Sequence, residues 1–122
     1  MTKFILSLAA EADIAAILAW SQSEFGEQAR LRYEALLTQS ILDIAVNPER
    51  LGVTKRDEVC EGAFTYHLWH SRLNVSESAG RVSKPRHFLL FRQTAGGTEI
   101  GRVLHDSMDL QQHLPAGYSD ES

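Results

Sequence analysis

The hydrophobic residues of this chain change their spacing at about residue 63, and this change restricts the fold more than any other feature. Residues 9–25 and 27–45 carry apolar or small side chains three and four positions apart, the spacing of a buried helix face. Gly26 separates the two segments, and Asn47-Pro48 ends the second, which predicts a helical hairpin. The predicted buried stripes are Ala10, Ile14, Ile17, Leu18 and Ser21 in the first helix, and Ala29, Tyr33, Leu36, Leu37, Ser40, Ile41 and Ile44 in the second.

Extended segments flank the helical pair. Residues 2–8 predict a first strand, and Ser7 is suited to cap the helix that follows. After a polar connection, the apolar side chains of residues 64–71 alternate, which is the spacing of a strand. Residues 87–93 and 99–105 predict two more strands joined by a glycine turn. The order strand, helix, helix and three strands predicts an α+β fold, with a helical hairpin packed on a small, mostly antiparallel sheet.

The strand at residues 87–93 is apolar on both faces, because it contains the run Phe88-Leu89-Leu90-Phe91. Such a run predicts a central strand that is covered on both sides. The helical pair accounts for one side, and either the segment 108–114 or a partner chain covers the other. We expect residues 1–114 to form a single domain and residues 115–122 to form a flexible tail.

The composition is that of an ordinary globular protein, since 43% hydrophobic and 23% charged residues fit neither a disordered chain nor a membrane protein. Its apolar runs are far shorter than the roughly 18 residues of a membrane span, so no membrane interaction is expected. Glu11 and Asp13 soon follow the apolar N-terminal run, so we expect no secretory signal. Cys60 is the only cysteine, which excludes a disulfide framework and favours a cytoplasmic location.

The net charge of −4 argues against broad, sequence-independent binding of nucleic acid. The charge is uneven, however, because residues 106–122 carry only acidic charges and residues 72–105 carry mainly basic ones. The basic residues of that middle segment are Arg72, Arg81, Lys84, Arg86, Arg92 and Arg102. The segment either faces an anionic partner or forms a solvated sheet face balanced by the acidic tail, and the sequence leaves both readings open.

Several segments resemble the ParE branch of the ParE/RelE toxins, and they occur in that family's order. Leu6-Ser7, followed by Ala10, Asp13, Ile17 and Trp20, resembles the opening strand and first helix, and FGEQARLRYEALL resembles the start of the second helix. NPERLG resembles the turn after that helix, and PRHFLLFR and IGRVLHDSMDLQQHL resemble the last two strands and the terminal segment. The resemblance covers roughly residues 3–114.

This resemblance implies a RelE/ParE-like fold and the toxin of a type II toxin–antitoxin module. A ParD-like antitoxin would neutralise it by laying a helix along the hairpin, often with added pairing at the sheet edge. The implied target is DNA gyrase, with DNA reached only through gyrase or the antitoxin. The antitoxin-binding surface is then expected at Trp20, Phe25, Arg30, Tyr33 and Leu37. The target-binding surface is expected at Arg86, His87, Arg102, His105 and Asp109.

A ribosome-dependent mRNA endonuclease is an alternative, because the sister RelE branch has the same scaffold. Cleavage needs proton-transfer groups and cations, which here would be His105, Arg86, Arg92 and Arg81. Those nucleases often carry a tyrosine after the histidine, where this chain has Asp106. We therefore favour a non-enzymatic toxin and interpret His105 as a strand-end residue held by Asp106, Asp109 or a backbone carbonyl. A further alternative is a degenerate toxin that only binds its antitoxin.

We expect neither a metal nor a cofactor. His67 and His70 lie three positions apart in a predicted strand and would face opposite sides of it. The chain has no HExxH motif, no Walker-type loop and no dinucleotide-binding loop.

Overall fold

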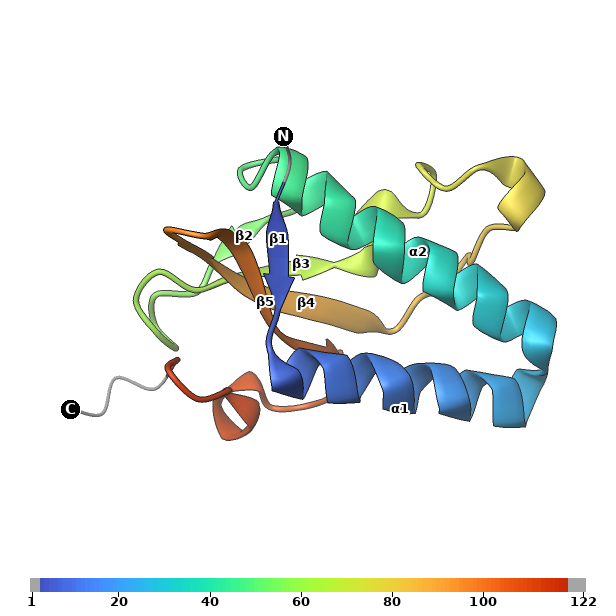
Figure 1. The fold of residues 1–122 in the computed structure, drawn as a ribbon, viewed down its shortest axis with the longest axis horizontal. Coiled ribbons are helices and arrows are strands. Elements are labelled where there is room, and N and C mark those ends of the chain that lie inside the picture. The colour runs from blue at the N-terminus through green and yellow to red at the C-terminus, as the bar shows by residue number, and fades with distance from the viewer. Residues whose placement is uncertain (1–2, 119–122) are drawn as a thin grey trace.

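The computed structural model describes residues 3–118, in which a helical pair packs against a five-stranded sheet (Figure 1). The described residues also contain three short 3₁₀ helices, at Leu68–Ser71, Glu77–Ala79 and Leu110–His113. The predicted α+β class and the order of its main elements are confirmed, with one more strand than expected. The elements are β1 (Phe4–Leu6), α1 (Leu8–Phe25), α2 (Glu27–Val46), β2 (Thr54–Lys55), β3 (Phe64–His67), β4 (His87–Thr94) and β5 (Gly97–His105).

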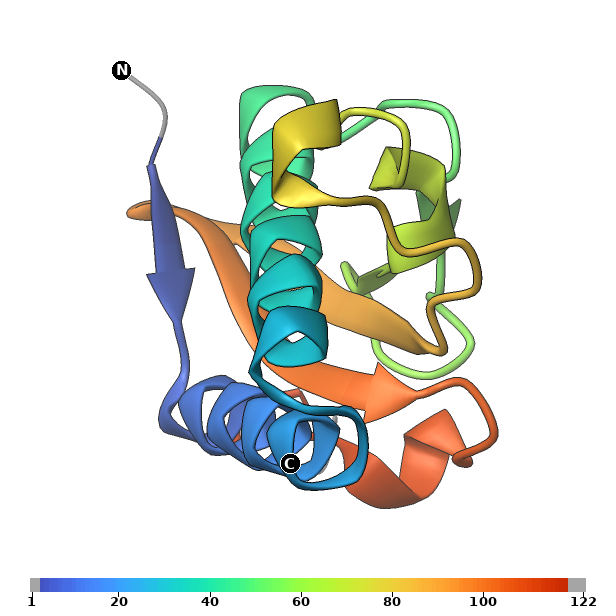
Figure 2. The ribbon, with the colours of Figure 1, turned by 90° about the vertical axis from the view of Figure 1, so that its right-hand side faces the viewer.

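The two helices begin and end where the sequence indicates. The side chain of Ser7 caps α1 by accepting a hydrogen bond from the backbone N–H of Ala10 at 3.0 Å. Gly26 lies between the helices with a φ of 95°, a backbone conformation that favours glycine. From this junction the helices diverge, so that α2 lies over one face of the sheet and α1 runs beside β5 (Figure 2).

The sheet has the order β1-β5-β4-β3-β2, and only β1 and β5 pair in parallel. The strand missed from the sequence is β2, whose two exposed polar residues show no hydrophobic alternation. The strand expected over residues 64–71 ends at His67, because the chain turns there into a 3₁₀ helix at Leu68–Ser71. Gly101 has no partner on β4, since Leu90 pairs with Arg102 and the next residue, Phe91, pairs with Ile100.

The face of the sheet under the helices forms the larger hydrophobic core. On α2, every predicted stripe residue from Leu36 onward is buried, whereas on α1 Ala10 and Ser21 are buried and Ile14, Ile17 and Leu18 are partly buried. These side chains meet the inward face of the sheet, where Tyr66, Leu89, Phe91, Ile100 and Val103 are buried. The helical spacing therefore predicted this core correctly.

The opposite face of the sheet is covered by the chain itself. Its buried residues are Ala63, Leu90, Leu104, Leu110 and Tyr118, with Leu114 and Phe88 packed beside them. The double-sided covering of β4 is thus confirmed, and it includes the C-terminal segment. The predicted flexible tail is not found at Tyr118, which is only 1% exposed; residues 119–122 of that prediction lie outside the described residues.

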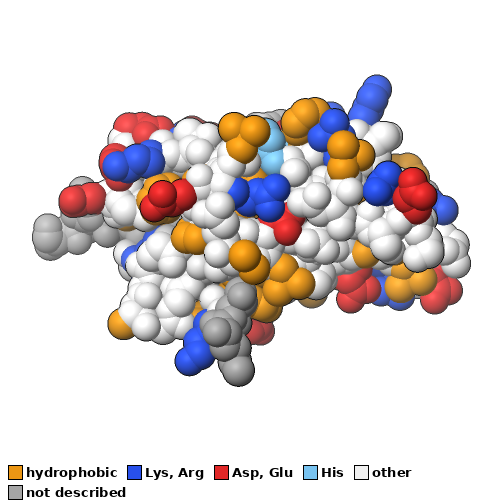
Figure 3. Space-filling model, turned by 90° about the horizontal axis from the view of Figure 1, so that it is seen from above, with side chains coloured by type: hydrophobic (Ala, Val, Ile, Leu, Met, Phe, Trp, Pro, Cys, Tyr) orange, Lys and Arg blue, Asp and Glu red, His pale blue; other side chains and the backbone are white. Residues whose placement is uncertain are grey.

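Elsewhere the surface is mixed. In the view of Figure 3, apolar side chains are scattered among charged groups of both signs. Within residues 3–118, no helix has the length and apolar character that a membrane span requires.

Candidate functional site

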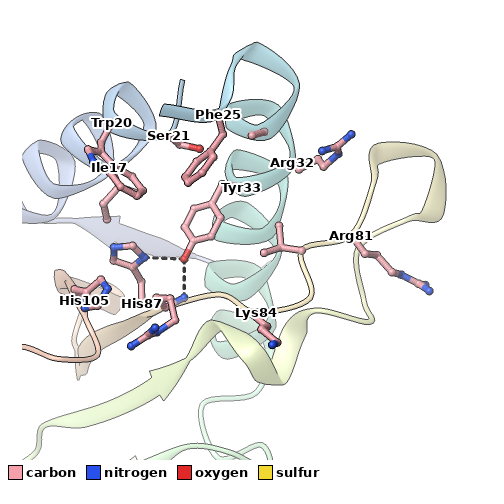
Figure 4. A pocket seen from close by; sticks show the side chains of 13 residues that line it. Ile17, Trp20, Ser21, Phe25, Arg32, Tyr33, Arg81, Lys84, His87 and His105 are labelled. Atoms are coloured by element: carbon pink, nitrogen blue, oxygen red, sulfur yellow. Dashed lines mark hydrogen bonds between the residues drawn. The ribbon is translucent and has the colours of Figure 1, made fainter. Parts of the chain in front are cut away.

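A pocket of about 390 Å³ lies where the junction of the two helices meets the start of β4 and the end of β5 (Figure 4). Ile17, Trp20 and Phe25 of α1 line it together with residues from α2, from the loop before β4 and from both strands. Three residues expected to bind the antitoxin and three expected to bind the target therefore share one pocket. They are Trp20, Phe25 and Tyr33 in the first group, and Arg86, His87 and His105 in the second.

The Tyr33 hydroxyl connects α2 to the start of β4. It accepts a hydrogen bond from the backbone N–H of Arg86 at 3.1 Å and lies 2.7 Å from Nδ1 of His87. The hydroxyl oxygen has two lone pairs, so in the second contact either Tyr33 or Nδ1 of His87 is the donor, depending on the tautomer of the imidazole. Burial raises the pKa of Tyr33 to about 12 and lowers the pKa of His87 to about 4. The pair is therefore uncharged at neutral pH.

The imidazoles of His87 and His105 meet edge to face, with 5.3 Å between ring centres. Nδ1 of His105 accepts a hydrogen bond from the backbone N–H of Ser107 at 3.1 Å and lies 2.8 Å from the Ser107 hydroxyl. The carboxylate of Asp106 is farther away, at 3.7 Å. His105 is thus a hydrogen-bonded strand-end residue, and its main partner is Ser107, which the sequence did not suggest.

The guanidinium of Arg86 is held at the mouth of the pocket by Asp106. Its Nε and one terminal nitrogen lie 3.0 to 3.2 Å from the two carboxylate oxygens, and His67 Nε2 contacts the same carboxylate at 3.1 Å. The hydrogen bonds from Arg86 lower the pKa of Asp106 to about 2. The positive charge of Arg86 is thereby partly neutralised.

The other two basic residues suggested for cleavage have different partners, although Arg81 also contributes to the pocket lining. Arg81 points away from the pocket in Figure 4 and donates to the carbonyls of Leu73 and Val75. Arg92 pairs with Glu99 at 2.7 Å and donates to the carbonyl of Gly117. Arg81 and Arg92 are therefore engaged away from His105, and of the three expected cations only Arg86 lies in the pocket beside it without a contact to the loop carbonyls or to Glu99.

Two residues expected at the target surface have structural contacts instead. Arg102 forms two hydrogen bonds to the Asp13 carboxylate, at 2.7 and 2.8 Å. The physical reason is that β1 ends at Leu6, after which α1 runs along β5 and brings Asp13 to this position. Asp109 caps the last 3₁₀ helix by accepting a hydrogen bond from the backbone N–H of Gln111.

The expected antitoxin-binding residues divide into exposed and buried ones. Trp20 and Phe25 are 57% and 67% exposed and contact each other edge to face, with ring centres 5.5 Å apart. Arg30 lies outside the pocket lining and bonds to Gln22 and Glu34. Leu37 is only 2% exposed, so it packs in the core and offers no exposed anchor; the helical spacing had also assigned it to the buried stripe.

Sequence reasoning missed Arg32 and Lys84 as pocket residues. In the part of the chain that the structure describes, neither of them forms an ion pair. Lys84 is one of the six basic residues of the segment 72–105, and the charge of that segment did not distinguish it from the other five. For Arg32 the sequence carried no such signal, because it lies on the exposed side of a helix.

His67 and His70 were expected on opposite sides of a strand, but they line the same shallow recess. The strand ends at His67, and the 3₁₀ helix that follows turns His70 back toward it. Among residues 3–118, no group of three or more His, Cys, Asp or Glu side chains is arranged to hold a metal ion.

A comparison with protein families relates this architecture to known proteins. The family model described as the ParE toxin of the type II toxin–antitoxin system parDE matches residues 4–110. A search of curated proteins finds no match. The matched region contains both helices, all five strands and every residue that lines the pocket. The chain therefore belongs to the ParE toxin family of type II toxin–antitoxin systems.

Proposed function

We propose that this ParE-family toxin inhibits DNA gyrase in the bacterial cytoplasm and that a ParD-like antitoxin neutralises it. One observation supports a gyrase inhibitor over a nuclease: each arginine suggested for cleavage is held by a partner. Arg86 pairs with Asp106, Arg92 pairs with Glu99, and Arg81 bonds to loop carbonyls. Stabilising a phosphorane requires cations aimed at one developing charge, and these three are not aimed at one point.

The surface proposed for the antitoxin is the exposed aromatic end of the hairpin. Trp20 and Phe25 are large apolar side chains that monomeric proteins normally bury, and they lie next to each other at the pocket. An amphipathic helix that covers them would also cover the entrance to His87 and His105. At the sheet edge, β1 is an outer strand whose Phe4 and Ile5 are 40% and 43% exposed, a position suited to pairing with an added strand.

A supercoiling and cleavage assay with purified gyrase tests the target. We expect the toxin to inhibit supercoiling or to trap cleavage complexes, and the antitoxin from the adjacent gene to relieve this. Lys84→Ala and Arg86→Ala, at the pocket mouth, should weaken the inhibition. Lys55→Ala, on β2 at the far sheet edge, is the matched control and should leave it intact. No effect on gyrase at saturating toxin would reject the proposal.

The adjacent imidazoles of His87 and His105 favour a second candidate, a ribosome-dependent mRNA endonuclease. Imidazoles at a pocket can transfer protons, and Tyr33 orients that of His87. This candidate predicts mRNA cleavage on translating ribosomes that His105→Ala abolishes. If expression without antitoxin does not inhibit growth and neither target responds, the remaining reading is a degenerate toxin that only binds its antitoxin.

A further inference from the structure

A second recess, separate from the shallow one described above, adjoins the pocket on the other side of the segment Ser83–Arg86. His67, Trp69 and His70 line this recess, and Lys84 and Arg86 line both hollows. The segment therefore separates two neighbouring depressions, and we call it the ridge. We call the surface around the ridge the aromatic–basic surface and define it by Trp20, Phe25, Trp69, Arg72, Lys84 and Arg86.

The lining of the two hollows has a charge opposite in sign to that of the whole chain. The chain has a net charge of −4, yet Asp106 is the only acidic residue among the described residues that line the two hollows. Its charge is matched by Arg86 at 3.0 Å. Arg32 and Lys84 then leave an excess of positive charge, so the surface attracts a polyanion although the protein as a whole repels one.

Aromatic rings are exposed on both sides of the ridge. Trp20 and Phe25 border the pocket, and Trp69, which is 45% exposed, borders the second recess. The guanidinium carbon of Arg72 lies 3.5 Å from the centre of the Trp69 ring. Its side chain also donates to the carbonyl of Trp69, so the ring and the cation are held as one unit.

We propose that the aromatic–basic surface binds single-stranded nucleic acid, with bases stacked on Trp20 and Trp69 and the backbone crossing the ridge at Lys84 and Arg86. Exposed aromatic rings beside a positively charged groove are how proteins hold single strands without reading their sequence, because every base has a face that can stack. An acidic peptide would satisfy the cations but would leave the two indoles without flat partners. A duplex would satisfy the cations but keeps its bases stacked on each other.

This binding is independent of whether gyrase is the target. It assigns the toxin a direct contact with nucleic acid, where the resemblance implied contact only through gyrase or the antitoxin. The comparison of DNA with RNA probes shows which type of single strand the surface binds more tightly. A failed gyrase assay would leave the binding measurements unaffected.

The test uses the purified full chain and fluorescein-labelled dT and U oligonucleotides of about 12 nucleotides, a length within the usual single-strand site sizes. Fluorescence anisotropy at low salt should give a Kd of about 1–100 µM that weakens steeply as salt is added. Trp20 and Trp69 are the only two tryptophans in the sequence. Each single Trp→Ala variant therefore keeps one indole, and its quenching reports contact at one hollow.

Trp69→Ala and Trp20→Ala should each weaken binding about fivefold or more, and Lys84→Glu should weaken it most at low salt. Leu8→Ala, at an exposed apolar residue near the start of α1, and Lys55→Glu are the matched controls and should bind like the unmodified chain. Circular dichroism checks that each variant is folded. Equal binding of a duplex or of poly-glutamate, unchanged binding by both Trp variants, or no binding at low salt would each overturn the proposal.

Discussion

The basic segment 72–105 contributes arginines to two regions of the molecule, and their surroundings differ. At the junction of α1 and β5, the side chain of Arg102 is 22% exposed and that of its partner Asp13 is 15% exposed. At the pocket mouth, Arg86 is 60% exposed and meets a single carboxylate. The first region uses an ion pair to join two elements, and the second presents charge to solvent.

The difference follows from what each carboxylate satisfies. Asp13 accepts from Arg102 and also from the backbone N–H of Val103 at 2.9 Å, a donor that has no strand partner because β1 has already ended. Asp106 accepts only side-chain donors, from Arg86 and His67. We therefore expect the pair Asp13–Arg102 to be needed for the stability of the fold and the pair Asp106–Arg86 to contribute little to it.

Asp13→Ala should produce the largest effect. It leaves a partly buried guanidinium and a backbone N–H without an acceptor, so we expect a loss of about 2–4 kcal/mol in the free energy of unfolding. Urea denaturation measures it. The matched variant Asp106→Ala removes an exposed pair and should cost less than about 1 kcal/mol. Equal losses in the two variants would contradict the distinction between the regions.

Tyr118→Ala should rank second. The Tyr118 ring is 1% exposed, lies 4.4 Å from the Arg92 guanidinium and packs against Gly101, where an added Cβ would lie 2.7 Å from it. We expect a loss of about 2–3 kcal/mol in unfolding free energy, below the usual range for buried aromatics because the residue lies outside the helices and strands. Met108→Ala, at an exposed site in the same segment, should change the urea midpoint little.

The fold was largely predictable from spacing, and the exceptions have physical causes. The period of the helices placed Leu36, Ile41 and Ile44 in the core, and the run at residues 88–91 identified the central strand. Tyr118 was missed because a lone aromatic among turn-forming residues carries no periodic signal. Strand β2 was missed because two polar residues cannot show alternation.

The site was predictable in its parts and not in its assembly. Trp20, Tyr33 and His105 were all named from the sequence, but as members of two separate surfaces, because residues far apart in the chain carry no signal of their distance. The junction at Gly26 places the end of the helical hairpin beside the start of β4 and the end of β5, and this brings the three residues into one pocket. The contact of Arg102 with Asp13 was not foreseen, because strand alternation gives the face of a residue and not its partner.

The lowered pKa of His87 predicts that the free energy of unfolding depends on pH, with an effect of intermediate size. Its pKa is about 4 when folded and 6.5 when unfolded, so between these values the unfolded chain binds more protons, and stability falls as the pH falls from 6.5 toward 4. We expect the free energy of unfolding to drop by about 1–2 kcal/mol between pH 7.5 and pH 5, after allowance for partial exposure. The pKa of His70 is also lowered, chiefly by burial, and acts in the same direction.

The variant His87→Gln should flatten this dependence, since glutamine does not titrate and its amide can still form a hydrogen bond with Tyr33. Urea midpoints at the two pH values measure it. His113→Gln, at a histidine outside the pocket, serves as the control. The same slope in the His87 variant would show that another group carries the acid sensitivity.

The smallest effect on stability is expected at the pocket entrance, and that makes it informative. Trp20→Ala and Phe25→Ala remove side chains that are more than half exposed, so each should change the free energy of unfolding by no more than about 0.5 kcal/mol. If these variants remain folded but no longer bind the antitoxin, the two rings contribute to partner binding and not to folding. A loss above about 1 kcal/mol in the free energy of unfolding would instead mean that Trp20 and Phe25 stabilise the core. The pocket entrance would then be a structural region, like the surroundings of Arg102, and not a surface for a partner.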